Sequence, residues 1–136
     1  SEREALQMQK KLKSNEFTLE DFREQLRSMR KMGSMKDVIG MLPGMNASAM
    51  KDANVDEKKL VHIDAIISSM TIKERQNHKL MNGSRRMRIA KGSGTSVSEI
   101  NRLLKQFVQM RKMMQKLLKV SNPGKAMRMM QDMMPN

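Results

Sequence analysis

Apolar residues recur every three or four positions along much of this 136-residue chain, and no stretch alternates β-branched and polar residues with the period of two that a strand requires. The clearest stripe lies between residues 97 and 119, just after a capping box formed by Ser96 and Glu99. It consists of Ile100, Leu103, Leu104, Phe107, Met110, Met114, Leu117 and Leu118. The pattern predicts the all-α fold class, a small helical domain with about four to five helices.

The core of such a domain has few aromatic side chains to draw on. The chain has 18 methionines and 11 leucines, but three phenylalanines and no tryptophan, tyrosine or cysteine. Its core must therefore be aliphatic and thioether. Without cysteine there is no disulfide, thiolate nucleophile or Cys-ligated zinc, and His62 and His78 lie on separate predicted helices without clustered ligands. We expect no catalytic residue, no metal site and no cofactor.

The charge of the chain is large and unevenly distributed. Its formal net charge is +13, and residues 85–136 contain 12 basic side chains but only two acidic ones, Glu99 and Asp132. Such an excess predicts a polyanionic partner, either a nucleic acid or an anionic membrane surface, that meets the second half of the chain. No apolar run is long enough to span a bilayer, so the sequence predicts a soluble protein.

Composition divides the chain into three predicted parts. Residues 1–16 are a helical lead-in or linker, residues 17–121 form the domain, and residues 122–136 are a methionine-rich tail that forms a further amphipathic turn or stays disordered. Within the domain, residues 35–54 contain glycines, a proline and four methionines without a long helical period, which predicts a flexible loop that contains at most one short helix. Residues 82–119 contain a short basic helix, a glycine-containing turn and the long helix.

The remaining helix ends follow from capping signals. Thr18 and Asp21 form a capping box for a first helix that Gly33 ends. A second helix is expected over residues 55–70, capped by Asn54 or Asp56. A third, short helix begins at a capping box of Thr71 and Glu74 and ends near His78.

The basic segment that begins at Ser84 is the first candidate for a binding surface. On a helix, Arg85, Arg88 and Lys91 recur every three residues and form a cationic stripe, with the hydroxyls of Ser84 and Ser93 beside it. Gly92 and Gly94 permit a tight turn in which the backbone comes close to a partner. Together with the long helix this predicts a helix-turn-helix that contacts nucleic acid. The alternative is a solvated basic helix that ends in a glycine cap.

The methionines are the second candidate. Helical spacing places some of them, such as Met70, in the core. Other methionines lie in the 35–54 loop or overfill the stripe of the long helix: Met35, Met41, Met45, Met50, Met110, Met113 and Met114. Because the unbranched, polarizable side chain adapts to varied apolar shapes, these residues suit a surface that binds many hydrophobic helices. The alternative is that they too are core.

The motif SRRMRIAKGSGTSVSEINRLLKQF closely resembles the RNA-binding element of the methionine-rich M domain in the signal recognition particle GTPase subunit, of the bacterial type. FTLEDFREQLRSMRKMGSM and the MLPGM loop are similar in order and spacing, so the resemblance covers essentially the whole chain. It implies binding of the conserved hairpin (domain IV) of the particle's RNA. The implied contact residues are Ser84, Arg85, Arg88, Gly92, Ser93 and Gly94, with Arg86 and Lys91 as supporting charge.

The resemblance also implies a groove for the hydrophobic signal sequences of nascent chains, built from the first helix, a finger loop and the long helix. Its candidate residues are Leu26, Met29, Met32, Ile39, Met41, Leu42, Met45, Met110, Met113 and Met114. Further implied partners are the ribosome and the GTPase domain of the same full-length protein. The implied function is co-translational targeting without enzymatic activity, in the cytoplasm and transiently at the membrane.

Two other functions are compatible with a basic helical chain. A DNA-binding helix-turn-helix protein would also be basic, although its second helix would carry polar residues that read bases, whereas this one is mostly apolar and lysine-rich. A basic amphipathic tail could instead bind an anionic membrane surface.

Overall fold

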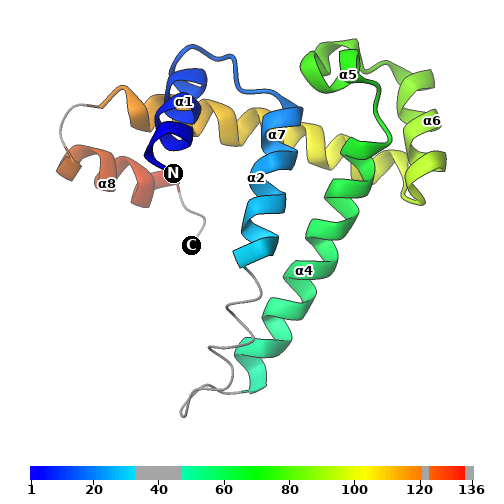
Figure 1. Ribbon diagram of the computed structural model, residues 1–136, viewed down its shortest axis with the longest axis horizontal. Coiled ribbons are helices and arrows are strands. Elements are labelled where there is room, and N and C mark those ends of the chain that lie inside the picture. Colours follow the sequence, from blue (N-terminus) through cyan, green and yellow to red (C-terminus); the bar gives the residue numbers. More distant parts are fainter. Residues whose placement is uncertain (33–46, 121–122, 134–136) are drawn as a thin grey trace. The chain divides into compact units, whose positions relative to one another are not determined.

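The computed structural model describes residues 1–32, 47–120 and 123–133, and every regular element in these ranges is helical (Figure 1). The all-α prediction is therefore confirmed. The elements are α1 (Glu2–Lys13), α2 (Leu19–Met32), α4 (Ala47–Ser68), α5 (Ile72–Gln76), the 3₁₀ helix η1 (His78–Leu80), α6 (Gly83–Ser93), α7 (Val97–Leu118) and α8 (Pro123–Met133). None of the helices in the described ranges combines the length and apolarity needed to cross a bilayer.

All three predicted capping boxes are present. In each, a hydroxyl oxygen accepts a hydrogen bond from the backbone N–H three residues on, and the carboxylate at that position accepts one from the capping residue. The backbone-to-carboxylate distances are 3.0 Å for Thr18 to Asp21, 2.8 Å for Thr71 to Glu74 and 2.8 Å for Ser96 to Glu99. Local sequence thus determines where α2, α5 and α7 begin.

The predicted start of the second helix was wrong. α4 begins at Ala47, so neither Asn54 nor Asp56 is its cap, and residues 47–54 of the expected loop are helical. The segment ASAMKDANVD has three alanines and no glycine or proline, and the helix propensity of alanine is the highest of all residues. The rest of the expected loop, residues 35–46, lies outside the described residues. In the tail, the two alternatives resolve in favour of a helix, α8, with Pro123 in its first turn.

The described residues divide into two compact units. One contains Ser1–Phe17 and the described residues from Leu104 onward. In it, the rings of Phe17 and Phe107 stack with centroids 6.3 Å apart, and the Arg111 guanidinium lies 5.2 Å from the centre of the Phe107 ring. Arg111 also donates to the Phe17 carbonyl oxygen at 3.2 Å, and Gln115 to that of Lys13 at 3.1 Å. α7 therefore holds α1 and the turn after it.

The other unit contains Thr18–Leu103, with α2 lying along α4 (Figure 1). Its core is aliphatic and thioether, as the composition predicted, and is formed by Leu19, Leu26, Ile66, Ile67, Met70, Met81, Ile89, Ala90, Ile100 and Leu103. At the surface beside this core, Arg27 of α2 makes a bidentate ion pair with Asp64 of α4, with N–O distances of 2.9 and 3.1 Å. Apolar burial and charged ties together join α2 to α4.

Replacing Phe107 with alanine should lower the free energy of unfolding by about 3–5 kcal/mol, because it leaves a cavity where Phe17 stacks and removes the ring under Arg111. Urea denaturation followed by circular dichroism measures this. Lys105→Ala, two positions away on an exposed part of α7, should change it by no more than about 0.5 kcal/mol.

Candidate functional site

α6 has well-defined ends, which fix the orientation of its side chains. Asn82 caps its N-terminus, where its side-chain oxygen accepts hydrogen bonds from the Arg85 backbone at 3.0 Å and from the Ser84 hydroxyl at 3.1 Å. At the other end Gly94 adopts the left-handed conformation with φ 71°, and the Thr95 N–H donates to the Ala90 carbonyl at 3.0 Å. Glycine takes this conformation at no steric cost. The helix therefore stops sharply at the predicted turn before α7.

One face of α6 packs inward and the opposite face is exposed. Ile89 and Ala90 are buried, whereas Ser84, Arg88 and Lys91 are exposed. Positions 84, 88 and 91 follow helical spacing, so these side chains share one surface. Of the sequence-predicted contact residues, the exposed ones thus fall largely on a single side of the helix.

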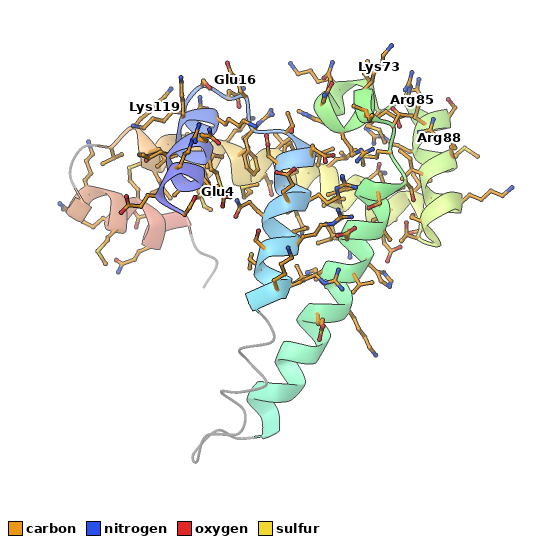
Figure 2. All side chains as sticks on the ribbon, viewed as in Figure 1. Glu4, Glu16, Lys73, Arg85, Arg88 and Lys119 are labelled. Atoms are coloured by element: carbon orange, nitrogen blue, oxygen red, sulfur yellow. The ribbon has the colours of Figure 1, made fainter. Side chains whose placement is uncertain are left out.

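Beside this surface lies a carboxylate that the sequence did not identify as part of the site. Glu74 is completely buried, yet its oxygens accept hydrogen bonds from the Arg85 guanidinium at 3.0 Å and from Arg88. The two arginine side chains are 37% and 50% exposed, so each guanidinium has one side on the carboxylate and another toward solvent (Figure 2). A guanidinium has five N–H donors, which leaves several to bind an anion.

The charge state of Glu74 follows from its contacts. Burial alone would raise the pKa of this carboxyl, but hydrogen bonds from the Thr71 backbone, Arg85 and Arg88 hold the pKa below its usual value of 4.5. Glu74 is therefore ionised at neutral pH. Its charge orients the two arginines before any ligand arrives.

Two other predicted contact residues make internal hydrogen bonds. The Arg86 guanidinium donates to the Met81 carbonyl at 3.2 Å and to the Asn101 side chain, which ties α6 to the residue after η1 and to α7. The Ser93 hydroxyl donates to the Ile89 carbonyl at 2.7 Å and lies 2.8 Å from the Thr95 hydroxyl. In this structure both side chains hold the turn region together, and a ligand contact by either stays a prediction.

Gly92 lies where α6 approaches the end of α4. A Cβ atom at this position would lie 3.8 Å from the Ser69 hydroxyl oxygen. Ser69 itself donates to the Ala65 carbonyl at 2.8 Å. The edge of the exposed α6 surface is therefore formed by a glycine next to the hydroxyl of Ser69, the residue that follows α4. Sequence reasoning missed this neighbour because it is distant in the chain.

The predicted methionine surface is described only in part. On α7, Met110 and Met113 line an open depression of about 580 Å³ together with Gln106, Gln109, Lys112 and Lys116. Met114 is half-buried on the same helix. The depression has thioether groups beside amide and ammonium groups, and so combines apolar contact with a charged rim.

The α2 candidates belong to the other unit. Leu26 is buried in the core, whereas Met29 is 58% exposed. Met32 ends α2, but its side chain lies outside the described residues, as do Ile39, Met41, Leu42 and Met45. A single groove that joins α2, the loop and α7 stays a prediction.

No group of three or more histidine, aspartate or glutamate side chains within the described part of the chain could hold a metal ion. His62 is exposed, and its nearest carboxylate oxygen, on Glu99, lies 3.8 Å away. The α6 surface can bind anions, and the α7 depression can bind apolar groups.

Comparison with known proteins identifies the family. Residues 1–135 match the family model described as the signal peptide binding domain. The chain belongs to this family. The family assignment confirms the resemblance predicted from the sequence, and the matched domain is one described by what it binds, not as a GTPase.

Relatives of this signal peptide binding domain carry the name signal recognition particle protein. The chain is 47% identical to that of Bacillus subtilis (strain 168) over 91% of its own length and 28% of the relative's. It is 46% identical to that of Escherichia coli (strain K12) over 97% of its own length and 29% of the relative's. It is 51% identical to that of Mycobacterium tuberculosis (strain H37Rv) over 79% of its own length and 21% of the relative's. The chain thus spans less than a third of these relatives.

Acid should weaken the domain partly through Glu74. Because its pKa is lowered on folding, the stabilisation it provides is present above the unfolded value, near pH 4.5, and is lost as the pH falls through the folded value. Glu74→Gln should lower the free energy of unfolding at about pH 7 by roughly 1–3 kcal/mol. The difference between the two proteins should shrink as the pH falls from neutral through and below about 4.5, as measured by urea denaturation. A difference that stays constant across this range would contradict the assigned charge state.

Proposed function

We propose that this chain is the part of a signal recognition particle protein that binds the domain IV hairpin of the particle's RNA through α6 and hydrophobic signal sequences through its methionine surface. It acts in co-translational targeting by binding alone and carries out no reaction. The observation that carries the RNA assignment is the buried Glu74 carboxylate, which presents Arg85 and Arg88 on an exposed basic helix.

Several features of the α6 surface support RNA as the ligand. Ser84, Arg88 and Lys91 are exposed together, and guanidinium groups bind phosphate oxygens with paired hydrogen bonds. The absence of a side chain at Gly92 allows a backbone to come close. The chain has no tryptophan or tyrosine for base stacking, so recognition by phosphate and groove contacts with a folded hairpin suits it better than binding of single strands.

The family description and the chemistry of α7 support the signal sequence as the second ligand. A signal sequence contains an apolar segment of about 7–15 residues whose sequence varies between proteins. Met110 and Met113 offer flexible thioether side chains that adapt to such varied surfaces. The exposed Met29 of α2 offers the same type of side chain in the other unit.

The cellular setting belongs to the same proposal. The relatives are named as components of the signal recognition particle, and this chain covers less than a third of their length. We infer that the remaining partners are the ribosome and a GTPase domain of the same full-length protein. The protein then acts in the cytoplasm and transiently at the membrane.

Replacing both Arg85 and Arg88 with alanine should weaken binding of the hairpin at moderate salt by about 1–3 kcal/mol for each residue. The control is Arg102→Ala, which removes one positive charge from an exposed position of α7. Filter binding or fluorescence anisotropy with a labelled hairpin measures the effect. Unchanged affinity of the double variant would exclude α6 as the RNA-binding element.

A competition experiment separates RNA recognition from the alternatives. Unlabelled hairpin should displace the bound, labelled hairpin far better than duplex DNA or vesicles containing anionic lipid do. This preference for the hairpin should persist as the salt concentration is raised. A non-specific polycation would instead lose all three ligands together with a steep salt dependence.

A signal peptide with a photo-reactive group in its apolar segment should crosslink to residues 29–50 and 110–114 and leave residues 84–96 unlabelled. Met87 provides an internal control, because it is 66% exposed but lies on α6. Mass spectrometry of the digested adduct locates the crosslinks. If Met87 is labelled as strongly as Met110 and Met113, the peptide reacts with any exposed methionine, and the crosslinks give no evidence of a binding groove.

A further inference from the structure

α5 is a helix of five residues that makes ion pairs to two other helices from consecutive positions. Glu74 accepts from Arg85 and Arg88 of α6. The next residue, Arg75, donates from Nη1 to the Glu20 carboxylate of α2 at 2.9 Å. Consecutive helical residues point about 100° apart, so one turn of helix can reach both neighbours. All of these residues belong to the unit Thr18–Leu103.

We propose that Arg75 and Glu20 are positioning residues for the RNA-binding face: they fix α5 on α2, and α5 in turn fixes the carboxylate that orients Arg85 and Arg88. This inference rests on the proposed RNA binding by α6. It adds that a helix without any predicted RNA contact determines how well α6 binds.

Burial of Arg75 and the negative charge of Glu20 separate this role from direct contact with RNA. The Arg75 side chain is 16% exposed and Glu20 is 34% exposed, whereas Arg85 and Arg88 are 37% and 50% exposed. Glu20 is moreover an anion, which phosphates repel. Its carboxylate is held in place by a second arginine, Arg23, at 2.6 Å. The Glu20–Arg75 pair therefore affects RNA binding only through the position of α5 and its Glu74 carboxylate.

The length of α5 explains why its position needs a tie of this kind. An isolated helix of five residues is not stable in water, so its place depends on contacts to neighbours. Its outward side provides few of them, because Ile72 is 66% exposed and Lys73 points to solvent (Figure 2). Hydrogen-bonded recognition tolerates displacements of only about half an ångström. A small shift of α5 would therefore move Glu74 enough to change how the arginines meet phosphate.

The test compares two substitutions that change charge identically. Glu20→Gln and Glu24→Gln each remove one negative charge from α2, and Glu24 is exposed one turn beyond Glu20. By charge alone, both changes would strengthen binding to a polyanion. The proposal instead expects Glu20→Gln to weaken hairpin binding about fivefold or more, while Glu24→Gln leaves it unchanged or slightly stronger. Equal affinities of the two variants, or tighter binding by Glu20→Gln, would overturn the proposal.

Substitutions of Arg75 test the same tie from the other side. Arg75→Gln should weaken hairpin binding about as much as Glu20→Gln, and Arg75→Lys, which keeps the charge, should restore most of the affinity. In the Arg85→Ala/Arg88→Ala background, measured at low salt, Arg75→Gln should have little further effect, since its targets are gone. An undiminished effect in that background would show a general loss of structure and refute the positioning role. Arg27→Gln, which breaks the α2–α4 pair with Asp64, controls for lost stability.

These outcomes are distinct from failure of the proposed function. If Arg85→Ala/Arg88→Ala binds the hairpin as well as the parent protein, RNA binding by α6 is wrong. If that variant loses affinity while Glu20→Gln and Arg75→Gln do not, α6 binds RNA but α5 needs no tie to α2.

Discussion

The unit Thr18–Leu103 depends on one buried negative charge. Removing a carboxylate from water costs several kcal/mol unless donors replace the lost hydration. Glu74 has three such donors, the Thr71 N–H and the guanidinium groups of Arg85 and Arg88. Each comes from a segment whose position the carboxylate then determines. The same group thus begins α5, holds α6 next to it, and keeps two cations at the surface in fixed places.

This arrangement reconciles a highly basic chain with a stable fold. Residues 85–136 contain 12 basic and two acidic side chains, and such an excess repels itself in a compact state. Three of the acidic residues before this region, Glu20, Asp64 and Glu74, make ion pairs that tie α2 to α4 and to α5, and α5 to α6. Repulsion is thereby reduced inside the unit, and the excess positive charge remains outside, where a polyanion can meet it.

Local interactions made much of this fold predictable. The capping boxes at Thr18, Thr71 and Ser96 and the stripe after Ile100 act within a few residues, so helix ends and buried faces could be deduced from sequence. The burial of Glu74 could not, because it depends on arginines 11 and 14 positions away and a capping box alone leaves its carboxylate at the surface. The start of α4 was missed because its polar first half lacks an apolar stripe, although its alanines favour helix. The predicted groove residues Ile39, Met41, Leu42 and Met45 lie outside the described residues.

The other unit is held together by a different kind of chemistry. α1 is fixed to α7 by stacked phenylalanine rings, by the Arg111 guanidinium and by backbone carbonyl oxygens that accept from Arg111 and Gln115. Burial lowers the pKa of Arg111, but an arginine remains charged throughout the physiological range, and neither carbonyls nor phenyl rings titrate there. The two halves of the domain therefore have separate vulnerabilities: acid strong enough to protonate Glu74, below about pH 4.5, would release the arginines of α6, while the attachment of α1 to α7 stays as it is.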